Sequence, residues 1–225
     1  MSDARPIIAV VPVKETHTAK QRLAEVLSAA ARQELALTML EDVLGALAEA
    51  RSLSGIIVVT IDAAAAQLAR DYGATIAAAG ARDGHTGAVN AAAKTLTARN
   101  AAMLTVPGDI PLIRVSDIEA VVDAHRRSAG FTIVPARDER GSNAILCSPA
   151  DAVPLRFGED SYFPHLAAAR SCGIEPVSVA LPRIALDIDQ PEDLMALLSW
   201  PYETRAHAAL RRHGISSRSL ATAGS

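Results

Sequence analysis

Short apolar runs alternate along the sequence with longer segments in which apolar residues recur every three or four positions. A continuous apolar run of this length is typical of a strand covered on both faces. The longer periodicity is typical of a helix with one buried face. The apolar runs predict strands over residues 7–11, 56–59, 74–78, 103–106, 131–135 and 144–147.

The helical periodicity fills the segments between these strands. We predict helices from residue 28 onward and over residues 63–72, 88–97, 116–127 and 164–172. Gly73 stands where a C-terminal cap is expected, and Ser116 and Glu119 have the spacing of a capping box. Pro191 suits the first turn of a last helix.

The alternation of strands and helices predicts one α/β domain over residues 1–210. Its expected form is a three-layer αβα sandwich with a mostly parallel sheet. Residues 211–225 are rich in Ser, Ala, Thr and Gly and are expected to form a flexible tail. In such sheets, ligands bind outside the carboxyl ends of the strands, so the residues that follow each strand are the candidates for chemistry.

Composition narrows the function classes. Half of the 225 residues are hydrophobic but only 3% are aromatic, so we expect a core of Ala, Leu, Val and Ile. The net charge of −3, without a basic run, argues against a nucleic-acid surface. No apolar stretch reaches the length of a membrane span and no secretory signal is visible. We therefore expect a cytoplasmic protein that binds no membrane, with reduced thiols at Cys147 and Cys172.

Three cations, Lys14, Lys20 and Arg22, follow the first predicted strand within nine residues. A nucleoside triphosphate needs cations where charge develops during transfer. The sequence has no GxxxxGK[ST] motif, and its first glycine is Gly45, so no Gly-rich phosphate loop follows this strand. Three basic residues by themselves are more typical of a solvated loop than of a phosphate site.

A single carboxylate, Asp109, lies in the turn 107–112, directly after an apolar strand. Mg²⁺ binds few carboxylates and completes its coordination with water and substrate phosphates, so one Asp at this edge suits a metal ion. A lone Asp after a strand is more often a helix cap or a turn residue, so by itself Asp109 favours neither that role nor a metal ligand.

Two further carboxylates, Asp187 and Asp189, precede the last predicted helix. In an extended segment they point to the same side, because side chains alternate there. Carboxylates held side by side repel unless a cation lies between them. The other interpretation is that Asp189 caps the helix and Asp187 is merely exposed.

Taken together, these segments resemble the guanylyltransferases of deazaflavin-coenzyme biosynthesis, the CofC/FbiD family. That family belongs to the nucleotide-diphospho-sugar transferase superfamily, which has a GT-A-like, Rossmann-like fold. The matching segments occur in the family's order: 12–14, 19–24, 90–92, 107–112, 141–144, 157–158 with Ser161 and His165, and 186–194.

The resemblance implies a Mg²⁺-dependent transfer of GMP from GTP to 2-phospho-L-lactate, phosphoenolpyruvate or 3-phosphoglycerate, with release of pyrophosphate. A substrate phosphate is already a nucleophile at neutral pH, so positioning and charge neutralisation suffice for this chemistry. The motifs do not distinguish between the three acids, and they leave a homodimer open.

The resemblance also assigns a role to each candidate residue. The metal ligands would be Asp109, Asp187 and Asp189. The acid would be bound by Lys14, Ser142, Gly158 and Ser161. The nucleotide would lie along Lys20, Arg22, Gly87, Asn90 and Gly108. Lys14 and Asp109 would act in catalysis, and Ser161 would open a helix whose free N–H groups favour an anion.

Two features depart from the family's pattern. Glu159 and Asp160 place two acids beside an anionic substrate, and the unusual segment 79–87 before Asn90 leaves the base contacts open. His165 matches the pattern, but a lone His on an Ala-rich helix is more often structural, so we assign it no catalytic role.

Two alternatives stay open. One is another transferase of the superfamily, similar to molybdopterin guanylyltransferases or cytidylyltransferases, and the missing Gly-rich segment counts against it. The other is a non-catalytic nucleotide-binding regulatory domain, and the three acidic positions count against that.

Overall fold

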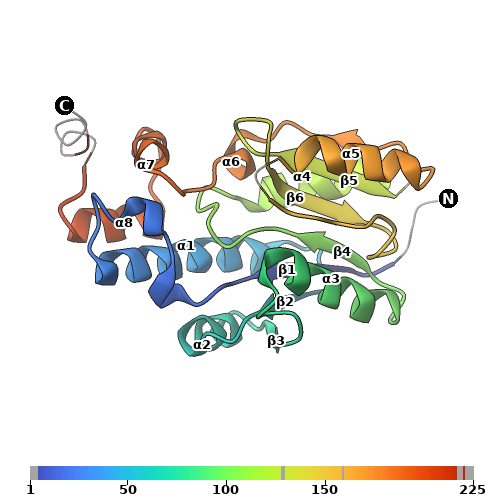
Figure 1. Cartoon of the computed structure of the whole chain (residues 1–225), viewed down its shortest axis with the longest axis horizontal. Helices are drawn as coiled ribbons and strands as arrows, with labels where there is room; N and C mark the ends of the chain where they lie inside the picture. The colour runs from blue at the N-terminus through green and yellow to red at the C-terminus, as the bar shows by residue number, and fades with distance from the viewer. Residues whose placement is uncertain (1–4, 128–129, 159, 217–219, 221–225) are drawn as a thin grey trace.

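The computed structural model describes residues 5–127, 130–158, 160–216 and 220. Within these ranges, the centre of the molecule is a seven-stranded sheet with the order β3-β2-β1-β4-β6-β5-β7 (Figure 1). The strands are β1 (Ile7–Pro12), β2 (Gly55–Val59), β3 (Thr75–Ala77), β4 (Ala102–Thr105), β5 (Phe131–Pro135), β6 (Ser142–Cys147) and β7 (Val177–Ser178). The six predicted strands are confirmed, and β7 is an addition.

The sheet is parallel except at β6. This strand pairs antiparallel with both β4 and β5, whereas the other neighbours pair in parallel. The predicted mostly parallel sheet is therefore confirmed. The reversal matters for the site, because it brings Ser142, at the start of β6, to the edge where the parallel strands end.

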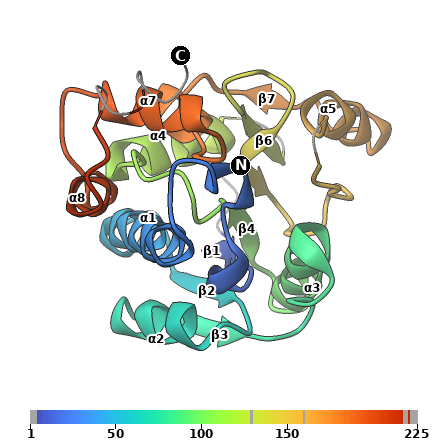
Figure 2. The same cartoon turned by 60° about the vertical axis from the view of Figure 1, so that its left-hand side comes forward.

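Helices cover both faces of the sheet. They are α1 (Ala29–Glu49), α2 (Ala63–Asp71), α3 (Gly84–Thr97), α4 (Val115–Arg126), α5 (Tyr162–Ser171), α6 (Pro182–Ala185), α7 (Pro191–Leu198) and α8 (Arg205–Arg212). Helices α1, α2 and α4 share one hydrophobic core with the sheet, and α3 and α5 share another. Figure 2 shows the sheet between α1 and α3. This is the predicted three-layer arrangement. Within the described ranges, no helix is long and apolar enough to cross a bilayer.

Strand β1 shows how one apolar run forms both cores. Ile7, Ala9 and Val11 pack into the core shared with α1, whereas Val10 packs into the core shared with α3. Side chains alternate across a strand, so a continuous apolar run is buried on both faces. Val10 and Val11 are fully buried, and burial of a Val side chain contributes roughly 1.5–3 kcal/mol.

The start of α4 differs from the prediction. Its N-cap is Arg114 rather than Ser116, and the Arg114 N–H donates to the Asp117 carboxylate at 2.9 Å. Glu119 instead accepts a hydrogen bond of 3.2 Å from the Ser52 N–H. The predicted capping box is wrong because the second acid of the motif binds a neighbouring segment.

The C-terminal part also differs. Pro191 opens α7 as predicted, but α7 is followed by α8, in which Ala206 and Leu210 pack with residues of α1 and α7. Helix α8 ends at Arg212, so helical structure continues past the expected domain boundary at residue 210. Much of the tail expected to be flexible, residues 217–219 and 221–225, lies outside the described residues.

Candidate active site

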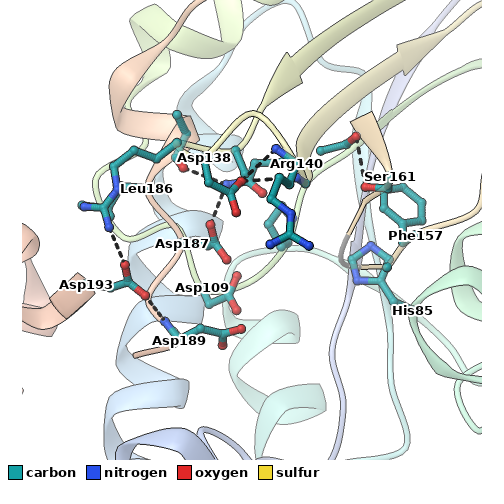
Figure 3. Close-up of a pocket in the computed structure, with 18 of the residues that line it drawn as sticks. His85, Asp109, Asp138, Arg140, Phe157, Ser161, Leu186, Asp187, Asp189 and Asp193 are labelled. Atoms are coloured by element: carbon teal, nitrogen blue, oxygen red, sulfur yellow. Dashed lines mark hydrogen bonds and ion pairs between the residues drawn. The ribbon is translucent and has the colours of Figure 1, made fainter. Parts of the chain in front are cut away.

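A cavity of about 960 Å³ opens at the carboxyl edge of the sheet (Figure 3). It is lined by residues that follow β1, β4 and β5, by the start of β6, and by the segments before α5 and α7. Eight residues predicted from the sequence line it: Lys14, Arg22, Asp109, Ser142, Gly158, Ser161, Asp187 and Asp189. The sheet thus brings together segments that are far apart along the chain.

The acidic end of the cavity is built by pairing two segments. The Ile188 N–H donates to the Asp109 carbonyl at 3.0 Å. Asp187 and Asp189 flank Ile188, so the alternation of an extended segment directs both toward the same side. Figure 3 shows the carboxylates of Asp109, Asp187 and Asp189 gathered at one end of the cavity.

Lys20 lies between two of these carboxylates rather than along the cavity. Its Nζ is 2.5 Å from Asp109 Oδ2 and 2.8 Å from Asp189 Oδ1, and its side chain is only 8% exposed. Burial lowers the pKa of Lys20, but the two carboxylates outweigh burial and hold the pKa above its usual value. The ammonium group predicted to contact the nucleotide is therefore engaged in an internal ion pair.

The capping interpretation of Asp189 is wrong. The N–H groups of Asp189 and Gln190 both donate to Asp193 Oδ2, at 3.0 and 2.9 Å. Asp193, in the first turn of α7, also forms an ion pair of 2.9 Å with Arg137. The Asp189 carboxylate therefore faces Lys20 and the cavity instead of the helix.

Two carboxylates keep unsatisfied charge. Asp109 Oδ1 is buried and has no hydrogen-bond partner in the described part of the chain. Burial and the charge of Asp109 raise the pKa of Asp187 to about 6, although Asn143 donates a hydrogen bond of 3.0 Å to Asp187. A cation beside these two groups would relieve both the orphaned oxygen and the repulsion.

A pair of carboxylates, rather than the predicted three, fits Mg²⁺. Mg²⁺ is usually held by one or two carboxylates, with water and substrate phosphates at its other positions. Asp109 and Asp187 can supply such a pair. A group of three or more His, Cys, Asp or Glu side chains placed to hold a metal ion is not found among the described residues. The predicted three-Asp arrangement is not assembled as the side chains stand, because Lys20 engages Asp189.

The other end of the cavity carries hydroxyl groups and an aromatic ring. The Ser161 hydroxyl donates to Ser142 Oγ at 3.2 Å, and the Phe157 ring lies 4.3 Å from the His85 ring. The Phe157 N–H donates to Thr86 Oγ1 at 3.0 Å, which ties the loop before α5 to the first turn of α3. Helix α3 begins at Gly84, earlier than predicted, so residues 84–87 of the unusual segment before Asn90 form its N-terminal turn.

The first turn of α5 offers less to an anion than predicted. The Tyr162 N–H already donates to the Arg140 carbonyl at 2.8 Å. Pro164, two residues later, has no N–H at all. The hydroxyls of Ser142 and Ser161 supply further polar groups at this end.

Cations stand along the rim of the cavity. Lys14 follows β1, and no ion pair forms between it and the residues that the structure describes. Arg140 pairs with Asp160 at 2.7 Å, and this contact lowers the pKa of the Asp160 carboxyl. The charge of Asp160 beside the site is thus offset by Arg140, while Glu159 lies outside the described residues. Sequence reasoning missed Arg137 and Arg140 because the segment 137–142 is typical of a charged hairpin turn.

Besides Lys20, three predicted nucleotide contacts do not line the cavity. Asn90 donates to the Leu155 carbonyl at 3.3 Å and so supports the loop before α5. Gly87 packs closely, since a Cβ there would lie 2.3 Å from the Asp83 side chain. Gly108 packs against side chains of α1 and β1. All three support the walls of the site from behind.

Comparisons with known proteins find relatives along nearly the whole chain. The family described as guanylyl transferase CofC like matches residues 7–224. A phosphoenolpyruvate guanylyltransferase of Roseiflexus castenholzii is 39% identical over 205 residues, which cover 91% of this chain and 94% of the relative. A 3-phospho-D-glycerate guanylyltransferase of Colwellia psychrerythraea is 33% identical over 195 residues, which cover 85% and 92%.

Solved structures show the same fold at low identity. A protein of Desulfovibrio desulfuricans G20 described as a nucleotide-diphospho-sugar transferase matches with a TM-score of 0.74 and 22% identity, covering 98% of this chain and 99% of that one. CMP:2-keto-3-deoxy-manno-octonic acid synthetase, complexed with CTP, matches with a TM-score of 0.60 and 14% identity, covering 92% and 99%. These likenesses confirm the predicted fold class, and the family match spans nearly the whole chain. The protein belongs to the CofC-like guanylyl transferases, a family of nucleotidyltransferases.

Proposed function

We propose that the protein transfers GMP from GTP to a phosphorylated three-carbon acid and releases pyrophosphate, with Mg²⁺ as its cofactor. The observation that carries this proposal is the division of the cavity (Figure 3). Asp109 and Asp187 keep unsatisfied charge at one end, and the hydroxyls of Ser142 and Ser161 lie at the other. The first end suits a triphosphate with its metal ion, and the second suits the acid.

Phosphoenolpyruvate is the acid we favour. The two Roseiflexus relatives, at 39% and 38% identity, are named for phosphoenolpyruvate, and the Colwellia relative is named for 3-phospho-D-glycerate. Both acids, like 2-phospho-L-lactate, carry a carboxylate and a phosphate on three carbons. We further propose that the product enters deazaflavin-coenzyme biosynthesis, in which case deletion of the gene should remove deazaflavin fluorescence from its host.

The reaction forms one bond and breaks one. An oxygen of the acid's phosphate attacks the α-phosphorus of GTP, the bond from that phosphorus to the β-phosphate oxygen breaks, and pyrophosphate leaves. Both reactants are anions, so the protein must hold them together and offset their repulsion. Mg²⁺ bound by Asp109 and Asp187 would neutralise charge on the phosphate oxygens.

Side chains of the cavity supply the remaining contacts. The Lys14 ammonium group, at the end of β1, orients the attacking phosphate and offsets its charge. Ser142 and the backbone at Gly158 hold the acid, and Arg22, which lines the cavity and lowers the pKa of Asp189, contacts the nucleotide.

The test offers the purified protein GTP, ATP, CTP or UTP with each of the three acids, with and without Mg²⁺, and follows pyrophosphate. We expect pyrophosphate only when GTP, Mg²⁺ and an acid are all present. Asp109→Asn should lower the rate by on the order of 10²-fold or more, because a charge-stabilising group contributes several kcal/mol. Equal turnover with CTP, or release of pyrophosphate without an acid, would contradict the proposal.

A further inference from the structure

His165 stands directly behind the hydroxyl end of the cavity. It lies on α5, is only 1% exposed, and contacts both the cavity wall and the loop before α5. Its Nδ1 is 3.0 Å from Ser142 Oγ, and its Nε2 accepts the Arg156 N–H at 3.0 Å. The Phe157 ring packs on it edge to face, with centroids 5.1 Å apart. The ring is therefore held by three different contacts.

The contact with Arg156 fixes the tautomer of this ring. A backbone N–H can only donate, so Nε2 must carry no proton. Burial lowers the pKa of His165 to about 4, so the ring is neutral at physiological pH. A neutral imidazole has one proton, which must then be on Nδ1. Nδ1–H therefore donates to Ser142 Oγ.

The direction of the Ser142 hydroxyl follows from this. A hydroxyl oxygen accepts two hydrogen bonds and donates one. Ser142 Oγ accepts one from His165 and one from the Ser161 hydroxyl, at 3.0 and 3.2 Å. Its own proton has no acceptor among the residues that the structure describes, and Ser142 lines the cavity. The proton is thus directed at whatever anion occupies this end.

We propose that His165 is a positioning residue that turns Ser142 into an obligatory hydrogen-bond donor to the anionic group of the acid. This inference rests on the proposed function, because it assigns the acid to the Ser142 end. It also accounts for how an anion is held although Tyr162 and Pro164 provide no free amide in the first turn of α5. Ser161 supports the same hydroxyl, and its own proton is used in doing so.

Two substitutions of His165 separate the contacts of its nitrogens. The Gln side chain reaches the Nε2 position, where its carbonyl can accept the Arg156 N–H, but it leaves no donor at the Nδ1 position. The Asn side chain places its NH₂ near the Nδ1 position and loses the acceptor for Arg156. His165→Gln should therefore raise the KM for phosphoenolpyruvate about tenfold, the effect expected for one hydrogen bond to a charged group. His165→Asn should stay within about threefold of wild type in KM and show the lower Tm.

The matched control is His125, a buried His on α4 bonded to Thr132 and Ser148 on the other side of the sheet. His125→Gln should lower Tm and leave the KM for phosphoenolpyruvate unchanged. The affinity for GTP, measured by calorimetry without acid, should not change in any of these variants.

A double-mutant cycle decides whether His165 acts through Ser142. In the Ser142→Ala background, His165→Gln should have no further effect on KM, because the hydroxyl that it orients is gone. Additive effects in this cycle would overturn the proposal, as would an Nε2–H tautomer at pH 7 in ¹⁵N NMR spectra of the wild type. Wild-type protein without turnover on any acid would instead contradict the proposed function, and the NMR tautomer would still decide the orientation of Ser142.

Discussion

The substitution Lys20→Met removes an ammonium group and keeps an unbranched side chain. Lys20 Nζ contacts Asp109 Oδ2 at 2.5 Å and Asp189 Oδ1 at 2.8 Å. Both carboxylates would lose their cation and would repel each other across the space it leaves. We expect this substitution to destabilise the fold and to leave the affinity for GTP nearly unchanged.

The magnitude depends on how far each partner is exposed. Removing one partner of a buried ion pair costs about 3–5 kcal/mol. The Asp189 side chain is 45% exposed, so its contact with Lys20 is screened by water and contributes about 0–1 kcal/mol. The Asp109 side chain is only 27% exposed and retains most of the effect. We therefore expect a loss of roughly 2–4 kcal/mol in the free energy of unfolding at pH 7.

The effect of pH has a definite sign. Burial raises the pKa of Asp189, but the charge of Lys20 outweighs burial, so the folded pKa is lowered. The stabilisation from ionised Asp189 is therefore lost only as pH falls through the folded pKa. The pKa of Lys20 is raised in the folded protein. The stabilisation from charged Lys20 is therefore fully present below the unfolded pKa of about 10.4 and is lost as pH rises through the folded pKa. The difference between wild type and Lys20→Met should be constant from about pH 6 to 9 and shrink below about pH 4.

The measurement is urea unfolding at 25 °C, followed by circular dichroism and by the fluorescence of Trp200, whose transitions should coincide. Lys94→Met, at an exposed position of α3, is the control and should change stability by less than about 0.5 kcal/mol. Calorimetry in the presence of Mg²⁺ and without an acid gives the affinity for GTP. A variant as stable as wild type but with a tenfold lower affinity for GTP would refute the ion-pair reasoning and place Lys20 on the nucleotide.

Three further substitutions test neighbouring features. Asp187→Asn should raise the free energy of unfolding of the metal-free protein by about 2–3 kcal/mol at pH 8, since the pKa of about 6 exceeds the unfolded value. Urea unfolding should show this gain disappear below about pH 4, and a loss at pH 8 would exclude the repulsion. Asn90→Ala should cost about 1 kcal/mol of stability and leave GTP affinity unchanged. Arg22→Ala should lower GTP affinity several-fold, measured by calorimetry. An unchanged affinity in Arg22→Ala together with a lowered affinity in Asn90→Ala would return Asn90 to the nucleotide.

The strands and the positions of three acids could be predicted because each rests on a local rule. An apolar run marks a strand buried on both faces, and the residue after a strand lies at the ligand edge of a parallel sheet. Asp109 follows from that rule. Asp187 and Asp189 precede α7 instead, and all three acids line the cavity. The period of two in the segment around Ile188 also anticipated that two of the acids would face the same way.

The partners of these residues could not be predicted, because they depend on contacts between distant segments. Lys20, Lys14 and Arg22 look alike in the sequence, yet Lys20 meets Asp109 and Asp189, which lie 89 and 169 positions away. Asn90 matched a motif, but its amide faces the Leu155 carbonyl 65 positions away. Helix α8 was missed although Ala206 and Leu210 have helical spacing, because the polar residues around them are also typical of a tail.

Lys20 balances only part of the negative charge that the three carboxylates bring to the cavity. Lys20 neutralises Asp189 and one oxygen of Asp109, and Asn143 partly satisfies Asp187. Among the residues that the structure describes, Asp109 Oδ1 is left without a partner, and the pKa of the Asp187 carboxyl stays raised. A triphosphate that arrives without a cation meets both carboxylates and is repelled, whereas one that brings a divalent cation relieves them. Buried polar groups that lack partners or neutralising charge commonly mark functional sites. Here the uncompensated carboxylates favour a triphosphate that arrives with its cation.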